Sequence, residues 1–196
     1  TTQVIDPYIG STVQVLTPLG QYLASTGVLQ NEVPTSATIG MIFTLVNTTG
    51  YFLFRADASF TNTLTLSLGG SGSLSLTIGG SATSIGPITL VAGVPYFLAV
   101  SANGVKANTV IRNLNTGQVY SAQYSLGATF VSTSDYWIGG AVGVGNESNA
   151  NIAACMYGVN NYLSIPQLQV WAEAPWDLWY PPNQLMFMSV KTSQSV

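Results

Sequence analysis

Hydrophobic and polar residues alternate with a period of two in many short segments of the chain. The clearest examples are residues 63–68 and 73–78, in which Leu or Ile alternates with Ser or Thr. Such alternation is typical of a β-strand with one face in a core and the other face wet or in an interface. The sequence Gly69-Gly-Ser-Gly72 between them is typical of a turn. We therefore predict two antiparallel strands whose leucines point into one core.

Similar apolar segments follow one another from residue 38 onward and predict further strands. They lie at 39–46, 51–57, 87–90, 95–101, 108–114, 118–124 and 136–139, with Gly- and Asn-containing turns between them. The first two flank Asn47-Thr-Thr-Gly50 and predict a hairpin. This spacing of short strands predicts an all-β fold, a two-sheet antiparallel sandwich.

The 196 residues favour one domain. Residues 12–16 alternate like a strand, but the rest of the first 37 residues is irregular and is broken by prolines and glycines. We predict an N-terminal arm with a first strand over 1–37 and the sandwich over 38–196. Terminal arms are ordered when they make contacts with folded protein, so we expect this arm to lie along another subunit.

Residues 151–190 hold three of the four tryptophans. The same segment contains the pattern that predicts the single short helix of the fold. Ser164 is the predicted N-cap, Pro166 fits the first turn, and Gln167 completes a capping box. The helix is predicted to span 164–173 and to stop at Pro175. We expect Trp176 to be largely buried in a hydrophobic plug at one end of the core. The alternative is an exposed aromatic surface for a sugar or a protein.

Only 6% of the residues are charged, against about 25% in a typical globular domain. Charge usually keeps proteins soluble, so this deficit predicts that neighbouring subunits cover much of the surface. The four basic residues stand singly along the chain, which argues against nucleic-acid binding. No apolar run is long enough to span a membrane. The chain starts at Thr1 without a basic signal peptide, which is consistent with removal of an initiator or a longer leader.

The residue inventory limits the chemistry that the chain can perform. Histidine is absent, which removes the usual general base and the commonest transition-metal ligand. The single cysteine, Cys155, cannot form an internal disulfide or a zinc site. None of the seven carboxylates alternates with another along one strand, as the carboxylate pair of a glycoside hydrolase would. Asp135, Asn146 and Glu147 could contribute to a calcium site, but their spacing is unspecific, and solvated loop carboxylates are the better interpretation. We therefore predict no cofactor, no metal and no enzymatic activity.

Several segments resemble the concanavalin A-like, laminin G-type jelly roll. They include Asn103-Gly104 at a strand end, Trp137-Ile-Gly-Gly140, and a strand over 152–162. The sharpest match is a Leu163-Ser164 pair, a short helix, and then Pro175-Trp176-Asp177-Leu178-Trp179. This ending is similar to that of laminin G-like proteins of tailed bacteriophages, although Ala174, Asp177 and Trp179 replace the family's Asn, Gln and Phe. The motif residues are Leu163, Ser164, Pro175, Trp176, Leu178 and Trp179.

The resemblance implies a structural protein of a bacteriophage virion. With no catalytic groups recognised, we predict a non-enzymatic capsid decoration protein as the first hypothesis. The alternative is a tail or fibre module that binds host-surface glycans through exposed aromatics such as Tyr136 and Trp137. The expected partners are other virion proteins, either the major capsid protein or tail proteins, and further copies of the chain. The expected location is the virion.

Overall fold

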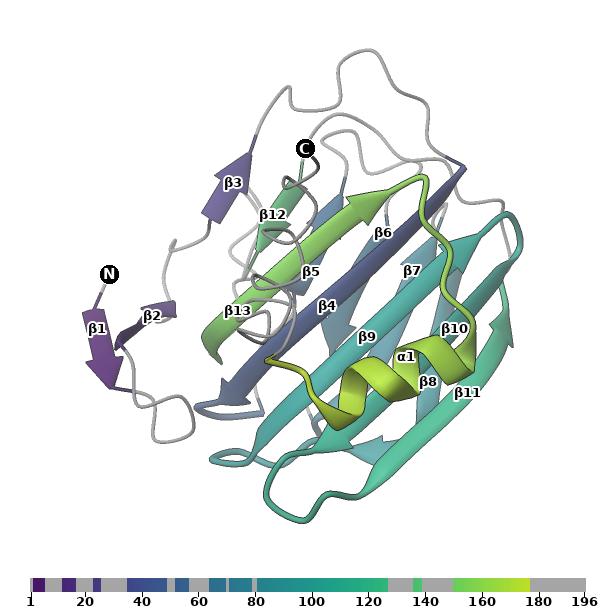
Figure 1. The fold of residues 1–196 in the computed structure, drawn as a ribbon. Coiled ribbons are helices and arrows are strands. Elements are labelled where there is room, and N and C mark those ends of the chain that lie inside the picture. Colours follow the sequence, from purple (N-terminus) through teal and green to yellow (C-terminus); the bar gives the residue numbers. More distant parts are fainter. Residues whose placement is uncertain are drawn as a thin grey trace, which may run out of the picture.

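The computed structural model describes residues 2–5, 12–16, 23–25, 35–48, 52–56, 64–69, 71–78, 81–126, 136–138 and 150–176. In these residues two antiparallel sheets stack face to face, and one helix packs on the outside of the larger sheet (Figure 1). The predicted all-β sandwich with one short helix near the C-terminus is therefore confirmed.

The larger sheet, sheet A, has seven strands in the order β1-β2-β13-β4-β9-β10-β11. Their bounds are β1 Thr2–Ile5, β2 Thr12–Leu16, β13 Ala150–Val159, β4 Ser36–Leu45, β9 Pro95–Asn103, β10 Lys106–Asn113 and β11 Val119–Ser125. The centre of the sheet is built from long apolar strands, as expected for strands covered on both faces. The hairpins β9–β10 and β10–β11 turn at Gly104 and Gly117, which both have the positive φ that glycine adopts without strain.

The smaller sheet, sheet B, has six strands in the order β3-β12-β5-β6-β7-β8. Their bounds are β3 Leu23–Ser25, β12 Tyr136–Ile138, β5 Phe52–Ala56, β6 Leu64–Leu68, β7 Ser73–Ile78 and β8 Ser81–Thr89. The β6–β7 pairing confirms the predicted hairpin, with Leu66 opposite Leu76. On the other face Ser67 Oγ and Ser75 Oγ form a hydrogen bond of 2.8 Å.

The hairpin predicted around residues 47–50 is wrong. β4 lies in sheet A and β5 lies in sheet B, so the chain crosses from one sheet to the other between them. The partners of β4 are instead β9 and β13, which come much later in the sequence. A polar turn between two apolar segments fits both connections, because local sequence does not specify which sheet the second strand joins.

The first 37 residues contribute strands to both sheets. β2 pairs with β13, with Asn151 opposite Val15, and β3 pairs with β12. These segments therefore belong to the sheets of their own chain. The division into an arm and a sandwich, and the contact of the arm with another subunit, stay predictions.

The main core fills the space between the two sheets. It gathers inward-facing residues of β4 and β9 in sheet A, such as Met41, Phe43 and Leu98, with Leu66 and Leu76 of sheet B. All five are almost fully buried. Leu66, Leu74 and Leu76 thus confirm the predicted inward face of β6 and β7 where the structure describes the side chains.

A second, smaller apolar cluster lies on the outer face of sheet A, under helix α1, Ile165–Glu173. Trp171 is 7% exposed and lies edge-on to Phe97, with 5.4 Å between the ring centroids. The ring of Trp171 sits over Gly40, where any Cβ would overlap it. A glycine in the centre of β4 thus lets the helix approach the sheet closely. Figure 1 shows α1 crossing in front of β9, β10 and β11.

Candidate functional site

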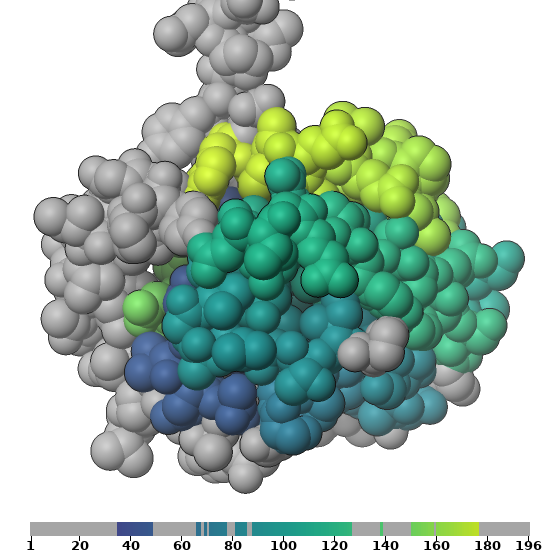
Figure 2. Space-filling view, turned by 90° about the horizontal axis from the view of Figure 1, so that it is seen from below, coloured from purple at the N-terminus to yellow at the C-terminus, as the bar shows by residue number. Residues whose placement is uncertain are grey.

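A pocket of about 330 Å³ opens between the two sheets at the end where the β10–β11 hairpin turns. Sheet B contributes the end of β8, and sheet A contributes the start of β9 and the hairpin. Its lining residues are Ile88, Thr89, Val91, Tyr96, Ile111, Asn113, Gln118, Val119 and Tyr120. In Figure 2 the yellow atoms of α1 lie on one side of this end, and the green atoms of the hairpin lie next to them.

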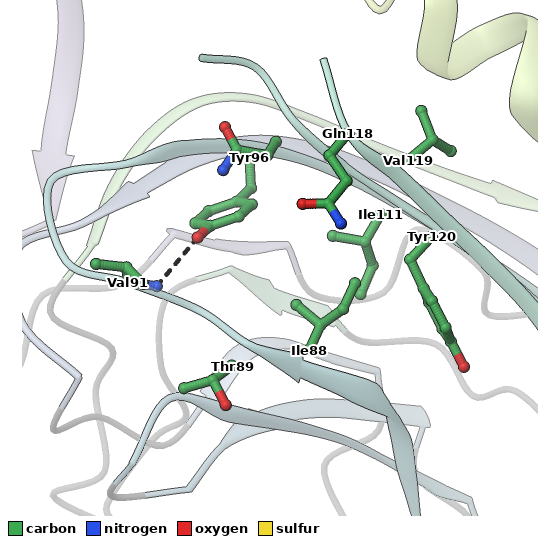
Figure 3. A pocket seen from close by; sticks show the side chains of 9 residues that line it. Ile88, Thr89, Val91, Tyr96, Ile111, Gln118, Val119 and Tyr120 are labelled. Carbon is green, nitrogen blue, oxygen red and sulfur yellow. Dashed lines mark hydrogen bonds between the residues drawn. The ribbon is translucent and has the colours of Figure 1, made fainter. Parts of the chain in front are cut away.

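The floor of the pocket is apolar and fixed. Tyr96 is 4% exposed, and its hydroxyl accepts a hydrogen bond of 3.1 Å from the backbone N–H of Val91. This bond ties the loop between β8 and β9 to the first residues of β9 (Figure 3). Ile111 is buried beside it, and Ile88 is half-buried on the opposite sheet. Tyr96 and Ile111 belong to the main core and Ile88 packs against it, so core packing holds the floor of the pocket.

Tyr120 forms an aromatic wall of the pocket. The residue lies opposite Ile111 in the β10–β11 ladder and is half-buried. Its hydroxyl lies 3.3 Å from the hydroxyl of Tyr124, which comes four residues later on the same face of β11. Because that bond holds one end of the ring, Tyr120 presents a pre-oriented surface to the pocket.

Two amide side chains stand at the rim. The Oδ1 atom of Asn113 accepts hydrogen bonds from the backbone N–H groups of Asn115 and Thr116, at 2.9 and 3.1 Å, so its position is fixed by the hairpin. Gln118 is exposed, and its side chain points between Tyr96 and Ile111 in Figure 3. Within the described part of the chain the backbone N–H of Gln118 donates to Thr116 Oγ1, whereas no hydrogen bond joins its side-chain amide to another group. It is therefore available to a ligand.

The lining contains no charged residue. Small-molecule pockets typically span about 300–1,000 Å³ and combine apolar walls with a few polar groups. This pocket lies at the lower end of that range and offers tyrosine rings, amides and the Thr89 hydroxyl. Such a site suits a small neutral ligand with both hydroxyl groups and apolar faces, because an ion would find no partner of opposite charge.

The predicted motif residues Leu163 and Ser164 anchor the helix rather than line the pocket. Leu163 donates its N–H to Ser101 Oγ at 2.8 Å, and its carbonyl accepts from Asn108 Nδ2 at 2.8 Å. Ser164 donates from both its backbone N–H and its Oγ to Gln167 Oε1, at 2.9 and 2.8 Å. Ser164 is therefore the N-cap that the capping pattern predicts, and the first helical residue is Ile165, one residue later than the predicted span. Two buried polar residues of sheet A, Ser101 and Asn108, hold the preceding loop.

The other end of the helix is fixed by a cation. Arg112 donates from Nη1 to the backbone carbonyls of Ala172 and Glu173, at 2.6 and 2.8 Å. These carbonyls lack partners within the helix, and a positive charge also suits the negative end of the helix dipole. Pro175 is buried just beyond, and Trp176 is half-buried beside the outer cluster. The most buried tryptophan of the described chain is Trp171.

The remaining predicted residues are only partly described. Tyr136 and Trp137 belong to β12, where they pair with β5 and β3, but their side chains are outside the described residues. Leu178 and Trp179 also lie outside them. Neither pair lines the pocket described above. A glycan or partner contact at Tyr136 and Trp137 stays a prediction.

The sequence did not single out the pocket residues. Tyr120 and Gln118 come from one hairpin, whereas Ile88 and Val91 precede β9, and only the stacking of the two sheets brings them together. The one local signal was the pair Tyr120 and Tyr124, which are four residues apart and so lie on the same face of a predicted strand.

The described residues contain neither a metal-ligand cluster nor a membrane-spanning helix. No group of three or more potential ligands among Cys, Asp and Glu comes together there. No helix in the same residues is long and apolar enough to span a membrane. Of the seven carboxylates only Glu173 lies in the described ranges, so the arrangement of the others is not described.

No protein-family model matches the sequence, and no curated protein matches it. Solved structures do match. Tailspike protein 2 of an Escherichia coli O157:H7 bacteriophage has a TM-score of 0.62 and 19% identity, over 84% of this chain and 25% of that chain. Domain 4 of the Geobacillus stearothermophilus arabinanase AbnA, in complex with arabinotriose, has a TM-score of 0.62 and 14% identity. The match covers 87% of this chain and 80% of that chain. Domains LG4-5 of the mouse laminin α1 chain have a TM-score of 0.52 and 17% identity, over 76% and 43%.

These matches establish the concanavalin A-like, laminin G-like fold that the sequence resembles. They do not bear on the phage-type ending, because the residues after Trp176 are not described. The chain spans about a quarter of the length of the tailspike chain that it matches.

The prediction that the chain is not an enzyme is wrong in the light of these comparisons. The similar structures include the enzymatically active domain of a phage tailspike, at a TM-score of 0.61, and a domain of an arabinanase. The fold is thus used in glycan-active proteins, and the absence of histidine does not exclude that chemistry. Glycoside hydrolysis uses a pair of carboxylates and does not need a histidine. The chain has seven carboxylates.

Proposed function

We propose that this chain is a carbohydrate-recognising module of a phage tail spike or fibre, and that the pocket beside the β10–β11 hairpin holds one neutral sugar unit. The observation that carries the proposal is the chemistry of the pocket. It places the Tyr120 ring next to two amide side chains and no charge. Sugar rings pair an apolar face with a rim of hydroxyl groups, and this lining complements both.

The comparisons support the same class of function. One similar structure is a phage tailspike, and another is a domain in complex with the neutral trisaccharide arabinotriose. The sequence led to two hypotheses, a capsid decoration protein and a tail or fibre module. These matches favour the tail or fibre module and give no support to capsid decoration. Virion partners, assembly with further copies and a virion location follow from this proposal.

The pocket can be tested by measuring sugar affinity in matched variants. Arabinotriose and other neutral oligosaccharides, with acidic oligosaccharides as a comparison, are titrated into the protein by calorimetry. Gln118→Ala is expected to weaken binding of a neutral sugar about fivefold, as for the loss of one hydrogen bond of about 1 kcal/mol. Asn115→Ala is the control, since Asn115 is an exposed amide of the same hairpin that does not line the pocket.

The outcomes separate recognition from other roles. Binding of a neutral sugar that weakens only in Gln118→Ala supports the proposal. No binding of any sugar, or equal loss in both variants, contradicts the pocket assignment. Chromatography of the oligosaccharides after incubation shows in addition whether the bound sugar is cleaved.

A further inference from the structure

Strand β11 is the outer edge of sheet A in the part of the chain that the structure describes. Its one strand partner there is β10. The ladder is fixed by hydrogen bonds at both ends, from Asn113 N–H to Gln118 carbonyl at 2.9 Å and from Leu126 N–H to Val105 carbonyl at 2.8 Å. Figure 1 shows β11 at the rim, with no labelled strand beyond it.

This ladder determines which backbone groups of β11 point outward. Hydrogen-bonded and non-hydrogen-bonded pairs alternate in an antiparallel ladder, so Tyr120, Ala122 and Tyr124 bond to β10. The N–H and C=O groups of the alternate residues therefore point away from the sheet. These residues are Val119, Ser121, Gln123 and Ser125. They form a row of donors and acceptors ready for another strand.

Exposed edges are usually protected against pairing by a charge, a proline or an irregular register. The edge strand of sheet B, β8, has such features, since Pro87 lies within it and its pairing with β7 shifts between Ser73 and Ser75. β11 has none of them. Its sequence VYSAQYS contains no charge and no proline, and its pairing with β10 is regular over seven residues.

We propose that β11 pairs antiparallel with β11 of a second copy of this chain, with Ala122 on the two-fold axis. A two-fold interface requires a surface that complements itself, and β11 is nearly symmetric about Ala122. Tyr120 then faces Tyr124 of the second copy, and Ser121 faces Gln123 of the second copy. Aromatic cross-strand pairs are favourable, and no like charges oppose each other.

This register also satisfies the outward backbone groups. Val119 pairs with Ser125, and Ser121 with Gln123, so outward-pointing residues always meet outward-pointing residues of the other copy. A single strand pair buries less than the roughly 1,200–2,000 Å² of a stable interface. The dimer is therefore expected to form in a concentration-dependent manner rather than permanently.

The first test removes one outward N–H. Proline is tolerated where an edge N–H faces outward, so Gln123→Pro blocks the second copy but keeps the β10 ladder. Gln123→Ala is the matched control, because both variants lose the 2.8 Å bond from Gln123 Nε2 to Asn108 Oδ1. By analytical ultracentrifugation, the wild type and Gln123→Ala should approach twice the 20.6 kDa chain mass as concentration rises. Gln123→Pro should stay at the chain mass.

The second test reads the register and does not depend on proline. Non-hydrogen-bonded pairs have Cα atoms about 4.5 Å apart, within the range of a disulfide. Ala122→Cys should therefore form a disulfide-linked dimer on mild oxidation, and Asn115→Cys, in the exposed hairpin loop, should not. The proposal is overturned if the wild type stays monomeric at all concentrations, if Gln123→Pro associates like the wild type, or if Ala122→Cys fails to cross-link.

Discussion

The contact between Trp171 and Gly40 allows a sharp test of how the helix is held on the sheet. Trp171→Ala removes a side chain that is 7% exposed and lies against Phe97. Truncation of a buried tryptophan costs about 3–5 kcal/mol, of which the aromatic pair contributes roughly 0.5–1.5 kcal/mol. Gly40→Ala alone should also destabilise, by about 1–3 kcal/mol, because the new Cβ overlaps the indole ring.

The double variant should reverse the sign of the glycine substitution. Without the indole ring the Cβ at position 40 has space, and alanine in a strand is more stable than glycine by roughly 0.5–1 kcal/mol. Gly40→Ala should therefore stabilise the Trp171→Ala protein. The change in unfolding free energy caused by Gly40→Ala should therefore differ by at least about 1.5 kcal/mol between the wild-type and Trp171→Ala proteins. A difference of this size is typical of the interaction energy between residues in direct contact.

Urea unfolding followed by far-ultraviolet circular dichroism measures all four proteins, and the midpoints are compared at constant m-value. Gly158→Ala in β13 is the control, because a Cβ there meets no atom within 4 Å of the described structure. Its effect should be the same with and without Trp171. If the effects of Gly40→Ala and Trp171→Ala add to within about 0.5 kcal/mol, the reasoning about this contact is refuted.

Two other substitutions test the groups that fix the sheet and the helix. Arg112→Met should cost about 1.5–3 kcal/mol in urea unfolding, because the two helix carbonyls lose a charged donor; an unchanged midpoint would contradict this. Cys155 is half-buried, and desolvation raises the pKa of its thiol from 9.0 to about 12, so the thiol should react slowly with iodoacetamide at pH 8 until urea unfolds the protein. The unfolded thiol ionises above pH 9 while the folded one keeps its proton, so stability should fall as pH rises from 9 towards 12. Cys155→Ala should not show the part of this loss of stability that comes from ionisation of the thiol.

The strands and the helix were predictable because their signals are local. Alternating leucines in β6 and β7 specify which side chains face the core, and a Gly-rich turn specifies their register. Ser164, Pro166 and Gln167 specify where the helix begins, and the structure places it one residue later, at Ile165.

The connections between the sheets were not predictable in the same way. The segment at residues 47–50 has turn chemistry, yet β4 and β5 lie in different sheets. The choice depends on which distant strand, such as β13, competes for the edge of β4. The burial of Trp171 likewise depends on Gly40, which is far away in the sequence and has no local pattern of its own.

The pocket depends on the same long-range geometry. Tyr120 looks like any alternate residue of a strand, and Gln118 looks like any polar residue of a hairpin. Their role appears only when β8 of the other sheet comes to lie opposite them and Tyr96 forms the floor. Counting histidines and carboxylates in the sequence could not reveal this neutral site, and it also misled the prediction about enzymatic activity.

The most direct measurement of the central proposal is a crystal structure of the chain soaked with arabinotriose. The account predicts one sugar ring against the face of Tyr120, with its hydroxyl groups bonded to the amides of Gln118 and Asn113. The same soak of Gln118→Ala should show weaker occupancy in the same place. Sugar bound only elsewhere, for example at Tyr136 and Trp137, or a pocket that stays free of sugar while calorimetry records binding, would contradict it.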